Sequence, residues 1–232
     1  QILVRASSLG EMARQEKEEV ILAGVVDVGP DTANTRYKSV YRPSGTAEDL
    51  YVAGNNNYLS TATPLVDWTD IDEVLRYHAE TVVDDRAIVG ERRPIMWMPN
   101  TLLVARKLAG TGARILSATE VRSGTASTSD VTMVTANPLR SIMGPMRVLS
   151  SPLLDFLATV SSSNYDDSDD WFLGDFKRQF VWQEIYPLQT LRAQANDEAQ
   201  FRRDIVARFK VRYFGGIAAI DERQVIKVNA VT

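Results

Sequence analysis

The segment from Ala207 to Tyr213 constrains the fold of this chain more than any other, because apolar and basic residues alternate along its whole length. Successive side chains of a β-strand point to opposite faces of the sheet. One face would carry Ala207, Phe209, Val211 and Tyr213, and the other would carry Arg208, Lys210 and Arg212. The pattern therefore predicts a strand with one apolar and one basic face.

Two segments nearer the N-terminus have the sequence features of helices. Residues 69–84 carry apolar side chains at helical spacing, and Thr69 or Asp70 can cap the first turn. Residues 7–24 consist mainly of good helix formers and begin with a capping box that starts at Ser8. We expect both helices to bury an apolar stripe.

The rest of the chain predicts short strands separated by turn residues. The expected strands cover residues 37–41, 94–98, 131–134, 147–149, 171–173 and 179–183, and residues 197–230 are expected to be mostly strand. The apolar run at 94–98 predicts a buried strand, followed by a helix over 101–109. Residues 117–129 predict a loop, and Gly215 with Gly216 predicts a break in the last long strand. Together these elements predict an α+β fold.

Composition excludes several kinds of chemistry. The chain has 232 residues, of which 44% are hydrophobic and 24% charged, enough to bury a core in one large or two modest domains. No apolar run reaches the roughly 18 residues of a transmembrane helix. Cysteine is absent, which excludes thiol catalysis and cysteine metal sites. The net charge of −4 lacks the basic footprint of sequence-specific DNA binding.

The sequence offers no recognisable catalytic or cofactor site. The single histidine, His78, lies on or beside the apolar stripe of its expected helix, and we interpret it as a partly buried structural residue. A second histidine ligand for a metal is impossible, and no glycine-rich phosphate loop carries the required lysine. We therefore expect no catalytic residue, no cofactor and no bound metal.

An acidic segment is a candidate surface loop. Residues 161–170 are polar and contain Asp166, Asp167, Asp169 and Asp170. Asp166, Ser168 and Asp170 have the spacing of the first EF-hand ligands, but Trp171 and Lys177 replace the required glycine and glutamate. We interpret the segment as an exposed loop without an ion.

A basic segment is the second candidate surface. It contains Arg202, Arg203, Arg208, Lys210 and Arg212. Three interpretations stay open: a solvated strand face, ion pairs between subunits, or contact with DNA phosphates.

Short motifs follow one another in a fixed order along nearly the whole chain. They are Leu9-Gly-Glu-Met-Ala13, the asparagine-bearing loop at 51–57, Trp68-Thr-Asp-Ile-Asp-Glu-Val-Leu75, Pro99-Asn-Thr-Leu-Leu-Val104, Asn137-Pro138, Ser151-Pro-Leu-Leu154, Trp171-Phe-Leu173, and closing segments at 204–215 and 220–227. This series resembles the major capsid proteins of tailed bacteriophages, in particular the group of Mu-like and Clp-protease-fused capsid proteins. The sequence departs from that group in lacking a histidine near Asn55.

The resemblance implies a two-lobed fold, shared with encapsulins. A peripheral lobe would contain residues 1–93, with a long spine helix, and a strand at about 205–213. An axial lobe would contain residues 94–204 and about 214–232, with the acidic loop near the symmetry axes. In this family an N-terminal arm and an extended hairpin loop precede the long helix, so we expect them to be absent from this chain or to lie upstream of Gln1.

The resemblance also implies a structural role rather than an enzymatic one. Copies would form pentamers and hexamers of an icosahedral capsid around double-stranded DNA, without specific DNA binding and without contact with a membrane. Assembly would take place in the bacterial host cytoplasm, with scaffold, portal and decoration proteins as further partners. Two alternatives stay open: an encapsulin-like nanocompartment shell that holds protein cargo, and an enzyme of unrecognised type.

Overall fold

The computed structural model describes residues 2–28, 49–84, 93–123, 133–142, 144–160, 165, 167–194 and 207–230. The helical elements are α1 (Ile2–Val25), η1 (Ala53–Asn55), α2 (Trp68–Thr81), η2 (Arg106–Leu108), α3 (Ala109–Ser117), α4 (Pro138–Ile142), α5 (Pro152–Val160) and α6 (Phe176–Gln179). The strands are β1 (Tyr58–Leu59), β2 (Val83–Asp84), β3 (Arg93–Pro94), β4 (Thr101–Ala105), β5 (Glu120–Ser123), β6 (Met133–Ala136), β7 (Arg147–Ser151), β8 (Trp171–Gly174), β9 (Phe180–Gln194), β10 (Ala207–Ala219) and β11 (Val225–Val228). This mixture of helices and sheets confirms the predicted α+β class.

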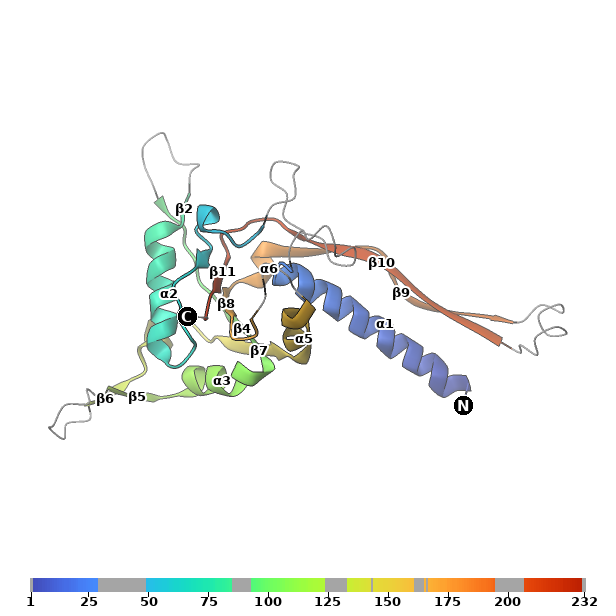
Figure 1. Ribbon diagram of the computed structural model, residues 1–232, viewed down its shortest axis with the longest axis horizontal. Coiled ribbons are helices and arrows are strands. Elements are labelled where there is room, and N and C mark those ends of the chain that lie inside the picture. The colour runs from blue at the N-terminus through green and yellow to red at the C-terminus, as the bar shows by residue number, and fades with distance from the viewer. Residues whose placement is uncertain are drawn as a thin grey trace.

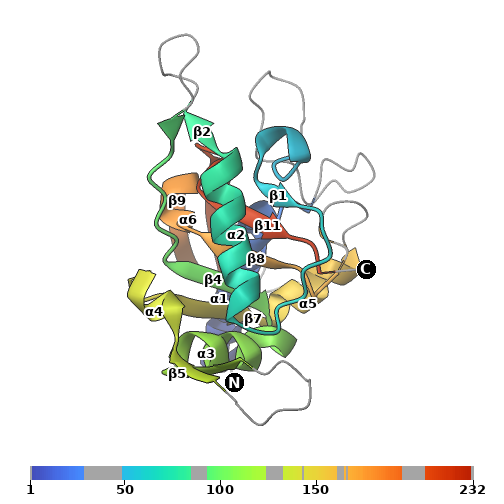
Figure 2. The ribbon, with the colours of Figure 1, turned by 90° about the vertical axis from the view of Figure 1, so that its left-hand side faces the viewer.

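A five-stranded mixed sheet lies at the centre of the wider part of the molecule, in the order β1–β11–β8–β4–β7 (Figures 1 and 2). β1 runs parallel to β11 and β4 runs parallel to β7, whereas β8 is antiparallel to both β11 and β4. Every residue of β4, β8 and β11 is buried. Strands buried along their whole length require a cover on both faces of the sheet.

Alternate residues of these strands enter two different apolar clusters. Leu103 of β4 and Phe172 of β8 pack with the C-terminal end of α1 and with α5. Leu102 of β4 and Trp171 of β8 pack with α2 and α3 on the other face. We call the sheet together with α2, α3 and α5 the sheet unit.

A long arm extends from the sheet unit and consists of α1 and the antiparallel hairpin of β9 and β10 (Figure 1). α1 lies along the hairpin, and Lys17 Nζ is 2.8 Å from Glu184 Oε1 of β9. The same ammonium group lies 4.9 Å from the ring centre of Trp182, within the range of a cation–π contact. α1 therefore joins the two units, because its C-terminal end also packs in the core.

α1 and α2 confirm the two predicted helices, although α1 begins earlier, at Ile2. The predicted cap of α2 is wrong. Asp67 is the N-cap residue, and its carboxylate accepts a hydrogen bond from Thr69 N at 2.7 Å. Asp70 closes a capping box instead, because its carboxylate accepts from Asp67 N at 2.8 Å.

The region from 94 to 109 differs from the prediction. Residues 95–100 form no strand, and Met96 is 90% exposed. The buried strand is β4, where a helix was predicted, and the helix α3 begins only at Ala109. A short apolar run that is buried on both sides has no period of two, so the sequence pattern does not separate a central strand from a helix.

Two predictions of where strands are absent or end are also wrong. β5 lies inside the segment predicted as a loop and pairs with β6. β10 continues through Gly215 and Gly216 to Ala219. β7, β8 and β9 confirm three of the predicted strands. The strand predicted at 37–41 lies outside the described residues.

The packing groups the elements differently from a division of the chain at residue 93. β1 and α2 precede that residue, yet β1 pairs with β11 and α2 packs on the central sheet. β9 and β10 pair from Phe180 to Gln194, although the sequence division placed β9 and the first half of β10 in different lobes. The two packing units are the sheet unit and the arm.

Asp170 is only 2% exposed, so the prediction of an exposed loop is wrong at this residue. Its Oδ2 is 2.9 Å from Lys227 Nζ, and its Oδ1 accepts a hydrogen bond from Ala230 N at 3.1 Å. Lys227 belongs to the buried strand β11 and therefore needs an anionic partner inside the protein. The last acidic residue of the segment supplies that partner.

We expect Lys227→Met to lower the free energy of unfolding by about 3 kcal/mol, because it leaves the buried Asp170 carboxylate without its cation. Lys107→Met is the matched control, since it removes a partly exposed pair in which Lys107 Nζ is 2.8 Å from Asp169 Oδ1. The control should lose less than about 1 kcal/mol. Urea unfolding followed by tryptophan fluorescence measures both, and equal losses would contradict the assignment.

Candidate functional site

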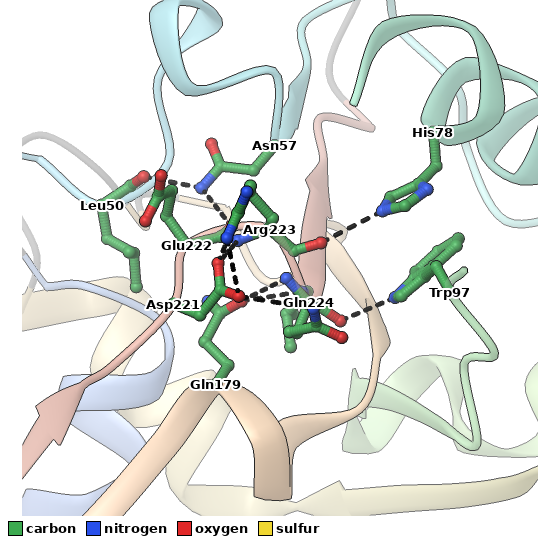
Figure 3. Close-up of polar contacts among 10 residues, drawn as sticks. Leu50, Asn57, His78, Trp97, Gln179, Asp221, Glu222, Arg223 and Gln224 are labelled. Carbon is green, nitrogen blue, oxygen red and sulfur yellow. Dashed lines mark hydrogen bonds and ion pairs between the residues drawn. The ribbon is translucent and has the colours of Figure 1, made fainter. Parts of the chain in front are cut away.

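The two segments that connect the β9–β10 hairpin to the sheet unit lie next to each other. α6 leads from β8 into β9, and residues 221–224 lead from β10 back into β11. Figure 3 shows that side chains from several elements converge on these four residues, which we call the junction turn. The position of the arm depends on how this turn is held.

Amide side chains hold both ends of the junction turn. Gln179 Oε1, fully buried at the end of α6, accepts hydrogen bonds from Gln224 N at 3.1 Å and Val225 N at 2.7 Å. Asn57 Nδ2 donates to Glu222 O at 3.0 Å. These contacts tie the outgoing and returning segments to one another and to the loop before β1.

Two stacked aromatic rings hold the outer side of the turn. The rings of His78 and Trp97 have centres 3.9 Å apart and planes inclined by 15°. Trp97 Nε1 donates to Gln224 O at 2.8 Å, and His78 Nε2 lies 3.1 Å from Arg223 O. A carbonyl oxygen only accepts, so Nε2 carries the proton. This environment agrees with the interpretation of His78 as a structural residue.

Burial lowers the pKa of His78 below its usual value, and the hydrogen bond to Arg223 O only partly opposes this shift. The imidazole is therefore neutral in the folded protein at neutral pH. When folding lowers the pKa of a histidine, the protein is most stable above the pKa that this histidine has in the unfolded chain. The free energy of unfolding then falls as the pH drops. The loss begins near the unfolded value of about 6.5.

The register of the hairpin shifts on both sides of Tyr186, which pairs with Phe214. Ile185 is the additional residue on one side, and Pro187, which has no N–H for the ladder, lies on the other. Bulges of this kind bend a strand and increase its twist. The hairpin accordingly bends along its length (Figure 1).

One face of the hairpin packs on α1. Trp182 and Glu184 contact Lys17, which places them on that face. A Cβ atom at Gly215 would lie 2.7 Å from the Trp182 ring, so glycine is required for this close approach. Neighbouring Gly216 points the other way and would meet nothing within 4 Å.

The opposite face of the hairpin has no cover within the described part of the chain. On β10 the even-numbered residues are more exposed than the odd-numbered ones, as the alternation in the sequence predicted. The register adds their partners on β9. We call this the uncovered face, and its main side chains are Val181, Tyr186, Leu191, Lys210, Arg212 and Phe214.

The structure describes only part of the predicted basic surface. Lys210 and Arg212 lie on the uncovered face and are exposed. Arg212 Nη2 donates to Gln189 Oε1 at 3.2 Å, and its guanidinium lies 5.9 Å from the ring centre of Tyr186. The backbone of Arg208 belongs to β10, whereas Arg202 and Arg203 lie outside the described residues.

The predicted acidic surface consists mainly of ion pairs within the chain. Lys107 Nζ lies 3.7 Å from Asp167 Oδ1 and 2.8 Å from Asp169 Oδ1, and Asp170 pairs with Lys227. Asp166 lies outside the described residues. Among the residues that the structure describes, no group of three or more acidic or histidine side chains is placed to hold a metal ion.

Sequence reasoning missed the residues that hold the junction turn. Gln179 and Trp97 belong to apolar runs, and their polar atoms act only on backbone groups distant in the sequence. Asn57 was noted only as part of an asparagine-bearing loop. The uncovered aromatic pair of Tyr186 and Phe214 was also missed, because Tyr186 lies beyond the end of the predicted strand. Aromatic and β-branched residues on both sides of Pro187 were the available signal.

The chain belongs to the phage capsid protein family, because the family described as "Phage capsid protein" matches residues 1–228. This confirms the resemblance seen in the sequence. The protein is a structural capsid subunit, and its place is in the virion capsid. None of the helices in the described part of the chain has the length and apolar character that a membrane crossing needs.

Phage structures are among the solved structures that are similar to this chain. One, described as Mycobacterium phage Ogopogo, has a TM-score of 0.46 and 16% identity, over 96% of this chain and 66% of that chain. Another, the asymmetric unit of the bacteriophage PhiM1 mature capsid, has a TM-score of 0.44 and 12% identity, over 91% of this chain and 59% of that chain. This chain therefore spans less than two thirds of either. No curated protein matches the sequence.

We expect the stability of the protein to fall between pH 7.5 and pH 5.5 through His78, by about 1 kcal/mol per unit that its pKa is depressed. His78 is the only histidine of the chain, so His78→Gln is a direct control. The variant should be less stable at pH 7.5 and should show a smaller change with pH. Urea midpoints at both values measure this, and identical pH dependence in the two proteins would contradict it.

Gly215→Ala should destabilise the protein by about 1–3 kcal/mol, because its methyl group collides with Trp182 and forces the hairpin away from α1. Gly216→Ala should be neutral or slightly stabilising, since its side chain meets open space and alanine restricts the unfolded chain. Urea unfolding and hydrogen exchange of the hairpin amides compare the two. Similar effects of both substitutions would contradict the face assignment.

Proposed function

We propose that this protein self-assembles into pentamers and hexamers of an icosahedral shell, and that the shell encloses double-stranded DNA. Membership of the phage capsid protein family supports assembly from identical subunits. The observation that carries the proposal is the arm, which holds exposed apolar side chains far from the chain's own core. A subunit that functioned alone would gain nothing from exposing them.

We further infer that the two packing units correspond to the two lobes of such a subunit. The arm, with its long helix, would be the peripheral lobe. The sheet unit would be the axial lobe, and it would include β1 and α2, because both pack on the central sheet. This assignment replaces a boundary at residue 93 with one at the junction turn.

The shell would hold its DNA without specific contacts. The chain carries a net charge of −4, which disfavours tight binding of phosphates. We infer a structural role without catalysis, which membership of the phage capsid protein family supports. Scaffold, portal and decoration proteins are the further partners that such a shell would require, with assembly in the bacterial host cytoplasm.

Electron microscopy with light scattering, on protein expressed from its complete reading frame, tests this proposal. We expect closed shells, or rings of five and six subunits, with nuclease-protected DNA in shells isolated from infected cells. A uniform monomer under all assembly conditions would contradict the shell. Shells that contain a protein cargo and no nucleic acid would instead indicate a nanocompartment.

A further inference from the structure

We propose that the uncovered face of the hairpin in one subunit docks on the outward side of α1 in a second subunit. The inference rests on the proposed function and names the two surfaces that meet. Both surfaces belong to the arm, but they lie on opposite sides of it. The uncovered face is the side of the hairpin that points away from α1, and the outward side of α1 points away from the hairpin.

The uncovered face has the composition of a protein interface. Tyr186 is 55% exposed and Phe214 is 59% exposed, and their ring centres are 6.5 Å apart. Val181 and Leu191 extend this apolar surface along β9, and Arg212 stacks near Tyr186. Aromatic residues and arginine are enriched at the cores of interfaces between proteins. DNA phosphates would use the two cations but not the exposed rings.

The outward side of α1 offers a complementary strip. Lys17 faces the hairpin, so residues half a turn away around the helix face outward. Ser8, Glu11, Met12 and Gln15 occupy that side in the half of α1 that extends from the core, and all four are exposed. Met12 is 64% exposed and gives an apolar contact that can adapt to a partner's rings.

The charges of the two surfaces are opposite. On the described part of the uncovered face the charged side chains are Lys210 and Arg212, both cations. Of the four exposed residues on the outward side of α1, Glu11 is the charged one, and it is an anion. Complementary potentials of this kind select the partner and fix its orientation.

This contact is heterologous, because each subunit presents one surface and receives the other. Such a contact repeats from subunit to subunit, and it forms a finite ring when the rotation between neighbours closes. A single contact through the arm would therefore be sufficient to order subunits around a capsomer.

Disulfide trapping tests the proposal directly, since the chain has no cysteine of its own. Gln15→Cys is combined in turn with Gln183→Cys, Lys210→Cys or Ala218→Cys on the uncovered face. Within one chain the thickness of α1, about 10 Å, separates such pairs, whereas a disulfide requires Cα atoms within about 7 Å. Any disulfide that forms therefore joins two subunits.

We expect at least one pair to give a ladder of covalent oligomers when assembled particles are oxidised. Gln15→Cys with Met96→Cys is the matched control, because Met96 is exposed on the sheet unit, and it should give no ladder. Shells that form normally but give no ladder with any of the three pairs would overturn this contact and leave the shell itself established. Failure of the unmodified chain to assemble would overturn both.

A charge exchange provides an independent test. Glu11→Lys or Arg212→Glu alone should slow assembly by about tenfold at low salt, because each places like charges across the contact. The double variant should recover most of the rate, while each single variant keeps the urea midpoint of the unmodified protein. A double variant that assembles no faster than the slower single variant would overturn the proposal.

Discussion

The hydrogen bonds to the junction turn are the constraint on which the rest of the structure depends. The chain leaves the sheet unit through α6 and returns through residues 221–224. Gln179 bonds on both sides of this turn: its backbone carbonyl accepts from Ile220 N, and its buried side-chain oxygen accepts from Gln224 N and Val225 N. Trp97 and His78 fix the same turn from the opposite side. Because these polar groups are buried, losing one partner costs the full desolvation of the other. The arm therefore leaves the sheet unit in one defined direction.

The sheet unit and the arm differ in how completely their own elements cover their apolar faces. The sheet unit is self-sufficient, since helices cover both faces of its three central strands. The arm is different, because one face of its hairpin packs on α1 while the other has no cover within the residues that the structure describes. Two-stranded ribbons are marginal by themselves, and α1 provides the packing against a helix that stabilises this one. The contact that we propose with a second subunit would cover this remaining face.

The prediction errors have a common physical origin. β4 was predicted as a helix, and Asp170 was predicted on the surface. Each was misjudged because its environment is made by distant segments: β8 and β7 surround β4, and Lys227 neutralises Asp170. Local patterns record which residues are apolar or charged, but they do not record how many sides of a segment are covered.

The sequence by itself determined the class of the fold, the two main helices, the strands β7, β8 and the start of β9, and the alternation of β10, because these follow from periodicities within a few consecutive residues. The ordered motifs were also sufficient to indicate the family. Only the tertiary structure decided that α2 belongs with the central sheet, that β10 continues through its glycines, and that Gln179, Trp97 and His78 meet at one turn. Those features depend on contacts between residues far apart in the chain, and such contacts leave no local pattern in a single sequence.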